Sequence, residues 1–441
     1  MKATTIAVID GGGRGSVLVK KYLKSPGVKK ILAIPGNDLM KSKNVQTFPN
    51  LKTTDVKEIV EICRKNNVSL VDVAQDDAIA AGLTNELQKA GIKCFGPTKE
   101  AAILEWDKAT SRNFMKKFNL PIPYYQCFSS EKEGIQFIQK SKDSKWFVKA
   151  SGLAAGKGAL PANNNKEAIE RIIEMKNFGK SGKTYLIEEC LEGEEFSSFA
   201  ILDGKNFKII GNAQDHKTVF NAGVGPNTGG MGCSSPPLAI TPKVQKQIEE
   251  IFKKTVEGLI SLNIKYQGIL YLGGMITENE LVKIIEFNCR WGDPEAQVIV
   301  PSIKEDLYDI CTNAASGNLN RTTITTDNLY RLVVTAASRG YPTDNSKALG
   351  KQIYGLDNLQ NSKEVEIFSA AVKSLNNKYT VAGGRLFYVM AEAKNILEAR
   401  KKVYNAIAHL YIEGNNLHFR TDIGNKDLAR FYNRLQKSPL S

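Results

Sequence analysis

The chain has little of the residue chemistry on which several common protein classes depend. Its 441 residues include only 3 histidines, and its 7 cysteines form no CxxC pair. Zinc sites and thiol redox sites place cysteines or histidines at short, regular spacing, so neither is indicated. The cysteines are spread from Cys63 to Cys311, which predicts reduced and mostly buried thiols.

Long apolar runs are also missing. No window of about 18 consecutive apolar residues occurs, so we expect no membrane span. The opening stretch MKATTIAVIDGGG is a short apolar segment followed by glycines. It lacks the pattern of a signal peptide, which favours a cytoplasmic protein.

The formal net charge is +14, from 60 Lys and Arg against 46 Asp and Glu. A basic balance of this kind can reflect nucleic acid or an anionic small molecule. The lysines are dispersed, however, and no arginine-rich or aromatic-interleaved stripe is present. We therefore expect no nucleic-acid partner.

The pattern of apolar segments predicts an α/β and α+β protein with about three domains. The first hundred residues alternate short strands with helices, which is typical of an open parallel α/β sheet. Strands are expected at 6–10, 30–34, 70–74 and 93–95, and helices near 15–24, 55–65 and 78–90. A helix at 101–118 follows. Further strands are expected at 146–149, 185–189, 197–202, 207–212, 268–276, 281–288, 330–336 and 384–389, with a helix at 396–408.

A glycine turn, Gly11 to Gly15, falls between the first strand and the first helix. Backbone amides at such a turn can receive an anion. The GxGxxG spacing is incomplete because Ser16 stands in place of the third glycine, and no acid for a ribose ends the second strand. A dinucleotide site is thus weakly indicated, and a turn that serves only the topology stays as open as one that binds substrate.

The most informative segment is EFNCRWGDPEAQ, residues 286–297. Side chains of a strand alternate between its faces, so Glu286, Asn288 and Arg290 should share one face while Ile285, Phe287 and Cys289 share the other. Carboxylate and amide oxygens suit Mg²⁺, and an arginine fork suits a phosphate or carboxylate. A solvated edge strand is the alternative.

Three other segments carry glycine or charge. The loop from Lys149 to Gly158 holds two lysines among glycines, which suits phosphate, although Gly158 excludes a Walker A motif. As an alternative it is a mobile surface loop. Segment 188–195 (EECLEGEE) is acidic, and segment 214–232 combines QDHK with GPNTGGMG.

Taken in order, these segments closely resemble the ATP-grasp superfamily and, within it, the phosphoribosylamine–glycine ligases. The matching stretches are FGPT, KASGLAAGKG, IEECLEGEE, QDHK, GPNTGGMG, EFNCRWGDPEAQ and, near the C-terminus, AGGR and RTDIG. The resemblance implies an N-terminal open parallel sheet (1–104), a small lobe (105–194) and large lobe (195–325) of a two-part ATP-grasp body, and a C-terminal α+β domain (326–441).

The resemblance also implies a reaction: ATP, glycine and 5-phosphoribosylamine give glycinamide ribonucleotide, ADP and phosphate through glycyl phosphate. No dedicated general base is evident, because the amine can attack in its neutral form. The chain is expected to be monomeric and monofunctional, with Mg²⁺ or Mn²⁺ as the metal.

Site residues are carried over by motif. Glu286 and Asn288 match metal ligands, and Arg290 would stabilise the transferring phosphate or the glycine carboxylate. Asp215, Lys217 and Asp293 would orient glycine and the ribosylamine. The residues expected to bind ATP are Lys108, Lys149, Gly152, Gly156, Lys157, Gly158, Glu188, Cys190, Leu191 and Glu195.

The chain departs from the family pattern at three places. GGREHA is replaced by GGRGSV at residues 12–17, GPE is replaced by AQDD at 74–77, and Ser151 stands where aspartate is usual. The first two lie where the ribosylamine is expected. Rival functions are another ATP-grasp ligase such as a biotin carboxylase, an aminoimidazole-ribonucleotide carboxylase enzyme, a dehydrogenase, a basic nucleic-acid-binding protein and a non-catalytic regulatory relative.

Overall fold

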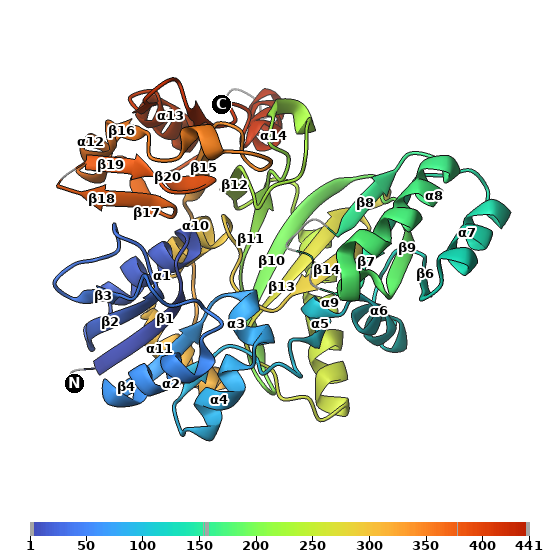
Figure 1. Cartoon of the computed structure of the whole chain (residues 1–441), viewed down its shortest axis with the longest axis horizontal. Coiled ribbons are helices and arrows are strands. Elements are labelled where there is room, and N and C mark those ends of the chain that lie inside the picture. Colours follow the sequence, from blue (N-terminus) through green and yellow to red (C-terminus); the bar gives the residue numbers. More distant parts are fainter. Residues whose placement is uncertain (1–3, 153, 155–157, 377, 438–441) are drawn as a thin grey trace.

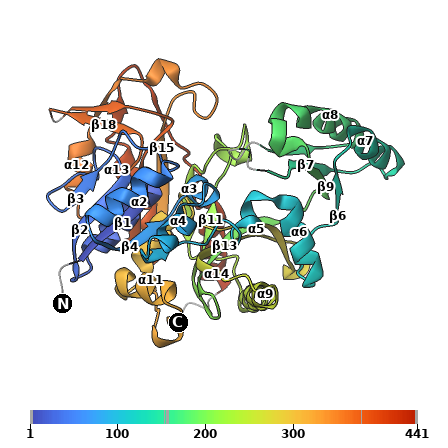
Figure 2. The ribbon, with the colours of Figure 1, turned by 60° about the horizontal axis from the view of Figure 1, so that its bottom comes forward.

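The structure is a computed structural model that describes residues 4–152, 154, 158–376 and 378–437. Within these residues the strands form four sheets. The N-terminal sheet and the C-terminal region lie on one side of the molecule, and a smaller lobe lies on the other, with a long central sheet between them (Figure 1). Figure 2 shows the same separation of the small lobe after a turn of the molecule.

The N-terminal sheet is parallel, with strand order β3-β2-β1-β4-β5. Residues Ile6 and Val8 of β1 enter one core, whereas Ala7 and Ile9 enter another, so helices cover both faces. This confirms the predicted α/β sheet, although β3 was not expected. The elements are β1 (Thr4–Asp10), α1 (Gly13–Leu23), β2 (Val28–Pro35), β3 (Val45–Thr47), α2 (Val56–Lys65), β4 (Val68–Val73), α3 (Asp76–Ala80), α4 (Leu83–Lys89) and β5 (Cys94–Phe95).

The small lobe is an antiparallel sheet in the order β6-β9-β7-β8. Its core joins Val148 and Ile187 of the sheet to Ile138 and Ile172 of two helices. The elements are α5 (Ile103–Trp106), α6 (Lys108–Lys117), β6 (Tyr125–Phe128), α7 (Glu131–Lys140), β7 (Trp146–Ala150), β8 (Ala159–Ala162), α8 (Asn165–Glu174) and β9 (Tyr185–Glu189).

The central sheet has nine strands, in the order β14-β13-β10-β11-β12-β15-β20-β17 with β22 paired to β15. Strand β12 pairs with β15, so the central sheet continues across the domain boundary expected near residue 325. The predicted division of the chain into domains stays a prediction. The elements up to β15 are β10 (Glu194–Asp203), β11 (Phe207–Asp215), β12 (Gly232–Ser235), α9 (Pro242–Ser261), β13 (Gln267–Ile276), β14 (Val282–Asn288), α10 (Ala296–Ile299), α11 (Leu307–Ala315) and β15 (Tyr330–Ser338).

The C-terminal region adds a fourth sheet in the order β18-β19-β16-β21. Helix α13 packs on β15 and β20 through residues such as Ile396 and Val403. The elements are β16 (Gln352–Tyr354), α12 (Leu356–Gln360), β17 (Glu366–Ser369), β18 (Val372–Leu375), β19 (Lys378–Val381), β20 (Arg385–Ala393), α13 (Ile396–Ile407), β21 (Tyr411–Ile412), β22 (Leu417–His418) and α14 (Asn425–Lys437).

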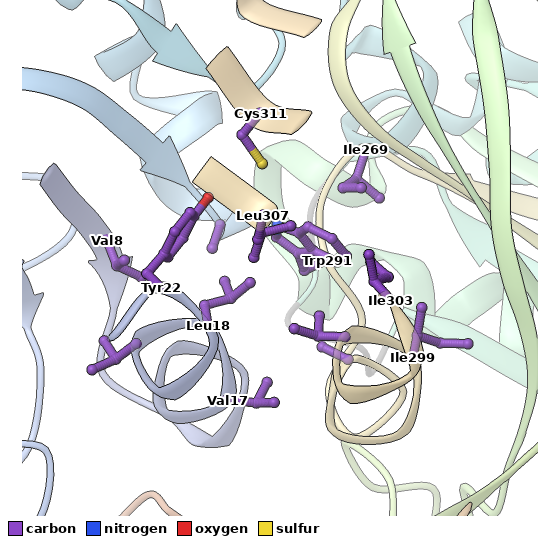
Figure 3. Close-up of a cluster of buried hydrophobic side chains, with 14 of the residues drawn as sticks. Val8, Val17, Leu18, Tyr22, Ile269, Trp291, Ile299, Ile303, Leu307 and Cys311 are labelled. Atoms are coloured by element: carbon purple, nitrogen blue, oxygen red, sulfur yellow. The ribbon is translucent and has the colours of Figure 1, made fainter. Parts of the chain in front are cut away.

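The segment that follows β14 returns to the N-terminal sheet. Figure 3 shows Leu18 and Tyr22 of α1 near Trp291 and Leu307 in one apolar cluster. Trp291 is only 1% exposed. Burial of a large aromatic side chain contributes much to packing energy, so this cluster fixes the loop that carries Arg290 and Asp293 against the N-terminal region.

Two predicted helices are each divided in the structure. The helix expected at 78–90 is α3 and α4, because Gly82 between them has φ +84°, which a continuous helix cannot include. The helix expected at 101–118 is α5 and α6, separated by Asp107, whose side chain accepts a hydrogen bond from the amide of Thr110 and caps α6.

Two expectations from composition agree with the structure. All seven cysteines are free, and only Cys127 and Cys190 are not buried. Within the described part of the chain, none of the helices has both the length and the apolar character needed to cross a bilayer.

Candidate functional site

Glu286 of β14 is close to four basic side chains from different parts of the chain. Burial alone would raise its pKa, but Lys108 of α6, Lys217 after β11, Lys149 of β7 and Arg290 together lower it to about 2. Glu286 is therefore ionised at neutral pH. Lys108, Lys149 and Glu286 line one small cleft between the lobes, so the structure brings these predicted residues together.

Beside it, Glu188 is held by two cations. Its carboxylate pairs with Arg112 Nε at 2.6 Å and Nη2 at 3.0 Å, and with Lys149 Nζ at 2.6 Å. Glu188 is 2% exposed, and these cations outweigh burial and lower its pKa to about 2. The carboxylate is thus already engaged, and it fixes the direction of the Lys149 side chain.

Arg112 also contacts β14, the strand that carries Glu286. Its Nη2 donates to the carbonyl of Ile285 at 2.6 Å, where β14 has a bulge between the pairs Gly273–Glu286 and Gly274–Ile284. The extra residue breaks the alternation, so Ile284, not Ile285, joins Phe287 and Cys289 in the core. The predicted grouping of Ile285 with that face was wrong.

Arg290 is oriented by three partners. Its Nη2 donates to Asn288 Oδ1 at 3.2 Å, its Nη1 donates to the Trp291 carbonyl at 3.2 Å, and its Nε lies 3.2 Å from Glu105 Oε1. Glu105 also accepts from the amide of Cys289 at 2.6 Å. Asn288 and Arg290 therefore lie together, as predicted. Glu105, which holds both Arg290 and the Cys289 amide, was not predicted.

The segment after β9 and the end of β11 meet through one ion pair. Lys217 Nζ lies 3.1 Å from Glu195 Oε2, and Glu195 chiefly raises the pKa of Lys217. Cys190 and Leu191 lie in the turn between β9 and β10 and are half-buried. The Lys217–Glu195 ion pair thus joins the start of β10 to the residues that follow β11.

The glycine-rich loop joins β7 to β8. Gly152 donates its amide to Ser181 at 3.0 Å, and a Cβ there would lie 2.8 Å from the Ser181 backbone. Gly158 accepts from the amide of Ala150 at 2.8 Å. Ser151, one of the departures, donates to Asp107 Oδ1 at 2.8 Å and so ties the loop to the start of α6. The predicted residues Gly156 and Lys157 lie outside the described part of the chain.

Asp215 lies close to a second carboxylate. Burial and the neighbouring Glu295 raise the pKa of Asp215 well above its ordinary value, with Lys217 opposing them. Glu295 accepts hydrogen bonds from the hydroxyls of Tyr271 at 2.7 Å and Ser197 at 3.2 Å. The buried Glu295 carboxylate near the half-buried Asp215 favours retention of a proton on Asp215.

Arg385 of β20 connects the glycine-rich GPNTGGMG loop with Asp293. The Asp293 carboxylate lies 3.1 Å from Arg385 Nη2 and accepts from Gln297 Nε2 at 2.7 Å. Arg385 also donates to the carbonyls of Asp293 at 2.9 Å and Gly229 at 2.5 Å. Arg385 belongs to the AGGR stretch, so this motif serves the site from β20.

A second cleft of about 730 Å³ lies at the carboxyl ends of the N-terminal strands, the usual ligand position in open α/β sheets. Of the two N-terminal departures, the one at 74–77 lines it through Gln75 and Asp77, and Asp77 accepts from Thr53 Oγ1 at 2.7 Å. Gly15 and Ser16 are not among its lining residues; Ser16 accepts from the amide of Ser369 at 3.0 Å. Its lining includes Asp10, Gly11, Gly12, Arg14, Lys52, Thr53, Gln75, Asp77, Asp293, Lys373 and Arg385.

Sequence reasoning missed Glu105 and Arg112. Arg112 follows Lys108 by four residues on α6, and residues at that spacing share a helix face, so the position was readable. Glu105 gave no such signal, because its partner Arg290 is distant in sequence and the loop between them is set by packing.

Comparisons with known proteins agree on one family. Models of the phosphoribosylglycinamide synthetase N domain, ATP-grasp (A) domain and C domain match residues 4–105, 106–296 and 331–426. Phosphoribosylamine–glycine ligase of Streptococcus pneumoniae R6 is 35% identical over 427 residues, covering 96% of this chain and 99% of that protein.

Human trifunctional purine biosynthetic protein adenosine-3 is also 35% identical, over 97% of this chain. The chain spans only 42% of the length of that protein. Among solved structures, phosphoribosylamine–glycine ligase from Thermotoga maritima has a TM-score of 0.78 at 28% identity, covering 95% of this chain and all of that one.

The biotin carboxylase domain of Hydrogenobacter thermophilus 2-oxoglutarate carboxylase, a complex with MgADP, has a TM-score of 0.74 at 14% identity. It covers 98% of this chain and 99% of that one. This likeness concerns the fold alone.

Proposed function

Because the chain belongs to the phosphoribosylglycinamide synthetase family, we propose that it joins glycine to 5-phosphoribosylamine with hydrolysis of ATP. The products are glycinamide ribonucleotide, ADP and phosphate, in purine biosynthesis. The observation that supports this most is the ionised Glu286 among Lys108, Lys149 and Lys217, in a cleft between two lobes. Transfer of a phosphoryl group depends on such positioning and charge neutralisation.

ATP would lie between the lobes. Lys108 and Lys149 would contact its phosphates, and Glu195 would contact the ribose beside Cys190 and Leu191. Glu188 would act through Lys149, since its carboxylate is already paired. ATP supplies the phosphoryl group that converts the glycine carboxylate into glycyl phosphate, a reactive acyl donor.

The donor atoms fit a hard cation. Glu286 offers an ionised carboxylate and Asn288 an amide oxygen, and Mg²⁺ prefers one or two protein oxygens together with phosphates. These two residues would hold the ion, which would neutralise phosphate charge. Arg290 lies beside them for the transferring phosphate or the glycine carboxylate.

The ribosylamine would occupy the cleft of about 730 Å³, because that cleft extends from the N-terminal strand ends to Asp293. Asp293 and Lys217 would orient glycine and the amine. Asp215, whose pKa is raised, would hold a proton nearby. The ribosylamine nitrogen attacks as the neutral amine, so no separate base is required. Use of Mn²⁺, a cytoplasmic location and a monomeric state stay predictions.

The function is tested by phosphate release with ATP, glycine and freshly generated 5-phosphoribosylamine, omitting each in turn. We expect release only with all three, with glycinamide ribonucleotide detected by mass spectrometry. ATP binding without product would contradict the assigned acid and amine while leaving the fold intact. Bicarbonate-dependent release would instead favour a carboxylase.

A further inference from the structure

The first turn contains a buried charge pair that no motif assigns. Asp10, the last residue of β1, accepts the amides of Gly12 at 2.5 Å and Gly15 at 3.1 Å through Oδ1. Its Oδ2 accepts from Arg14 Nε at 2.7 Å. Asp10 is 1% and Arg14 7% exposed. Buried charge pairs with satisfied hydrogen bonds are strongly directional, so this one fixes the Arg14 side chain.

Asp10 also leaves no room for a side chain at position 15. A Cβ at Gly15 would lie 2.8 Å from Asp10 Cβ and 2.9 Å from Asp10 Oδ1. The glycine at position 15 therefore lets the turn close around the Asp10 carboxylate, which accepts the Gly15 amide.

Arg14 also contacts the loop after β14, which contains Arg290 and Asp293. Its Nη1 donates to the carbonyl of Trp291 at 2.9 Å, the same carbonyl that accepts from Arg290. The Trp291 ring is fixed in the core beneath. Arg14 and Arg290 carry like charges close together, and Asp10 supplies charge that balances Arg14.

We infer that Asp10 is a positioning residue of the ligation reaction. Its carboxylate binds the amides of the turn on one side and the Arg14 guanidinium on the other. Through Arg14 it holds the carbonyl of Trp291 and so the position of the backbone between Arg290 and Asp293. Asp293 lines the cleft of about 730 Å³ proposed for the ribosylamine. This inference rests on the proposed function. It predicts an effect on the ribosylamine step and little effect on ATP binding, because the Lys149–Glu188 pair lies elsewhere.

The test compares Asp10→Asn with wild type, measuring kcat, KM for ribosylamine and the ATP dissociation constant. We expect kcat/KM for ribosylamine to fall about 10- to 100-fold, as for other displaced reactive groups, while ATP affinity stays within about twofold. The matched control is Glu86→Gln, which removes an exposed pair of the same 2.7 Å length, Glu86–Lys89, from the same domain. Unchanged kinetics in Asp10→Asn, or equal loss of ATP affinity, would overturn the inference.

A wild-type protein that forms no product would refute the proposed function, not the Asp10–Arg14 contact. The contact is then judged by melting midpoints. Asp10→Asn/Arg14→Gln should be no less stable than the worse single variant if the two side chains act as a pair. Additive losses would overturn the inference independently of activity.

Discussion

Glu188→Gln is the sharpest perturbation of the site, because it removes one charge and almost no volume. The carboxylate neutralises Arg112 and Lys149, which are 3% and 9% exposed. A folded pKa of about 2 against the ordinary 4.5 corresponds to roughly 3 kcal/mol, at about 1.4 kcal/mol for each pH unit. Loss of one member of a buried pair typically costs about 3–5 kcal/mol, which agrees.

The chain offers a matched control four residues away. Glu192 pairs with Lys145 at 2.6 Å, the same length as the Glu188–Lys149 pair, but both of its side chains are exposed. Glu192→Gln therefore removes the same chemical group at the same distance in water, where screening weakens the pair. We expect it to leave the stability of the small lobe unchanged.

Amide hydrogen exchange is the suitable assay, because a chain of several domains does not unfold in one step. A loss of about 3 kcal/mol should speed exchange of the β7 and β9 amides roughly a hundredfold in Glu188→Gln at neutral pH. Equal exchange in Glu188→Gln and wild type, or an equal change in Glu192→Gln, would refute the reasoning from burial.

The pH dependence of the wild type follows from the same pair. The folded pKa of Glu188 is depressed, so its contribution to stability is complete above pH 4.5 and is lost as the pH falls from 4.5 towards 2. Glu188→Gln lacks this contribution at every pH. The difference in exchange between the two proteins should therefore shrink across that window.

Three further predictions concern separate parts of the site. Glu286→Ala should abolish ATP-dependent phosphate release, since three lysines lose their counter-charge and the proposed metal loses a ligand; a wild-type rate would remove the metal assignment. Gly13→Ala should lower the local stability by about 1–3 kcal/mol, measured by faster amide hydrogen exchange of β1 and β20, because its Cβ would lie 2.0 Å from Tyr388 of β20. Arg430→Ala should weaken ATP binding about two- to fivefold by calorimetry, because Arg430 of α14 pairs with Glu194 at the start of β10, next to Glu195, the acid proposed to contact the ribose; unchanged affinity would separate α14 from the site.

Local patterns were enough to predict most of the longer strands, because side chains alternate along a strand. The grouping of Glu286, Lys108 and Lys149 in one site came from the resemblance to the family, because these residues are far apart in sequence. The bulge at Ile285 was not predictable, because one inserted residue leaves the composition of β14 unchanged. The division at Gly82 was missed because a glycine is tolerated in a helix as well as between helices.

Contacts between distant segments explain the remaining misses. Arg112 and Glu188 are 76 residues apart, and Arg385 and Asp293 are 92 apart. Nothing in either local sequence states which partner the arginine will meet, since that depends on how the domains pack. Asp10 shows the same limit: its carboxylate accepts the amide of Gly15 five residues later and pairs with Arg14, and neither contact was predicted.

These distant contacts have a common target in the backbone of residues 284–291. Arg112 of the small lobe donates to the carbonyl of Ile285, and Arg14 of the N-terminal sheet donates to that of Trp291. Arg290 binds the same Trp291 carbonyl from within the segment. Each arginine is also paired with a carboxylate: Arg112 with Glu188, Arg14 with Asp10, and Arg290 with Glu105. Glu286 therefore lies between two backbone carbonyls, Ile285 and Trp291, that accept charge-assisted hydrogen bonds from two different domains. We expect a shift of either domain relative to the central sheet to strain one of these bonds and so to move the Glu286 carboxylate.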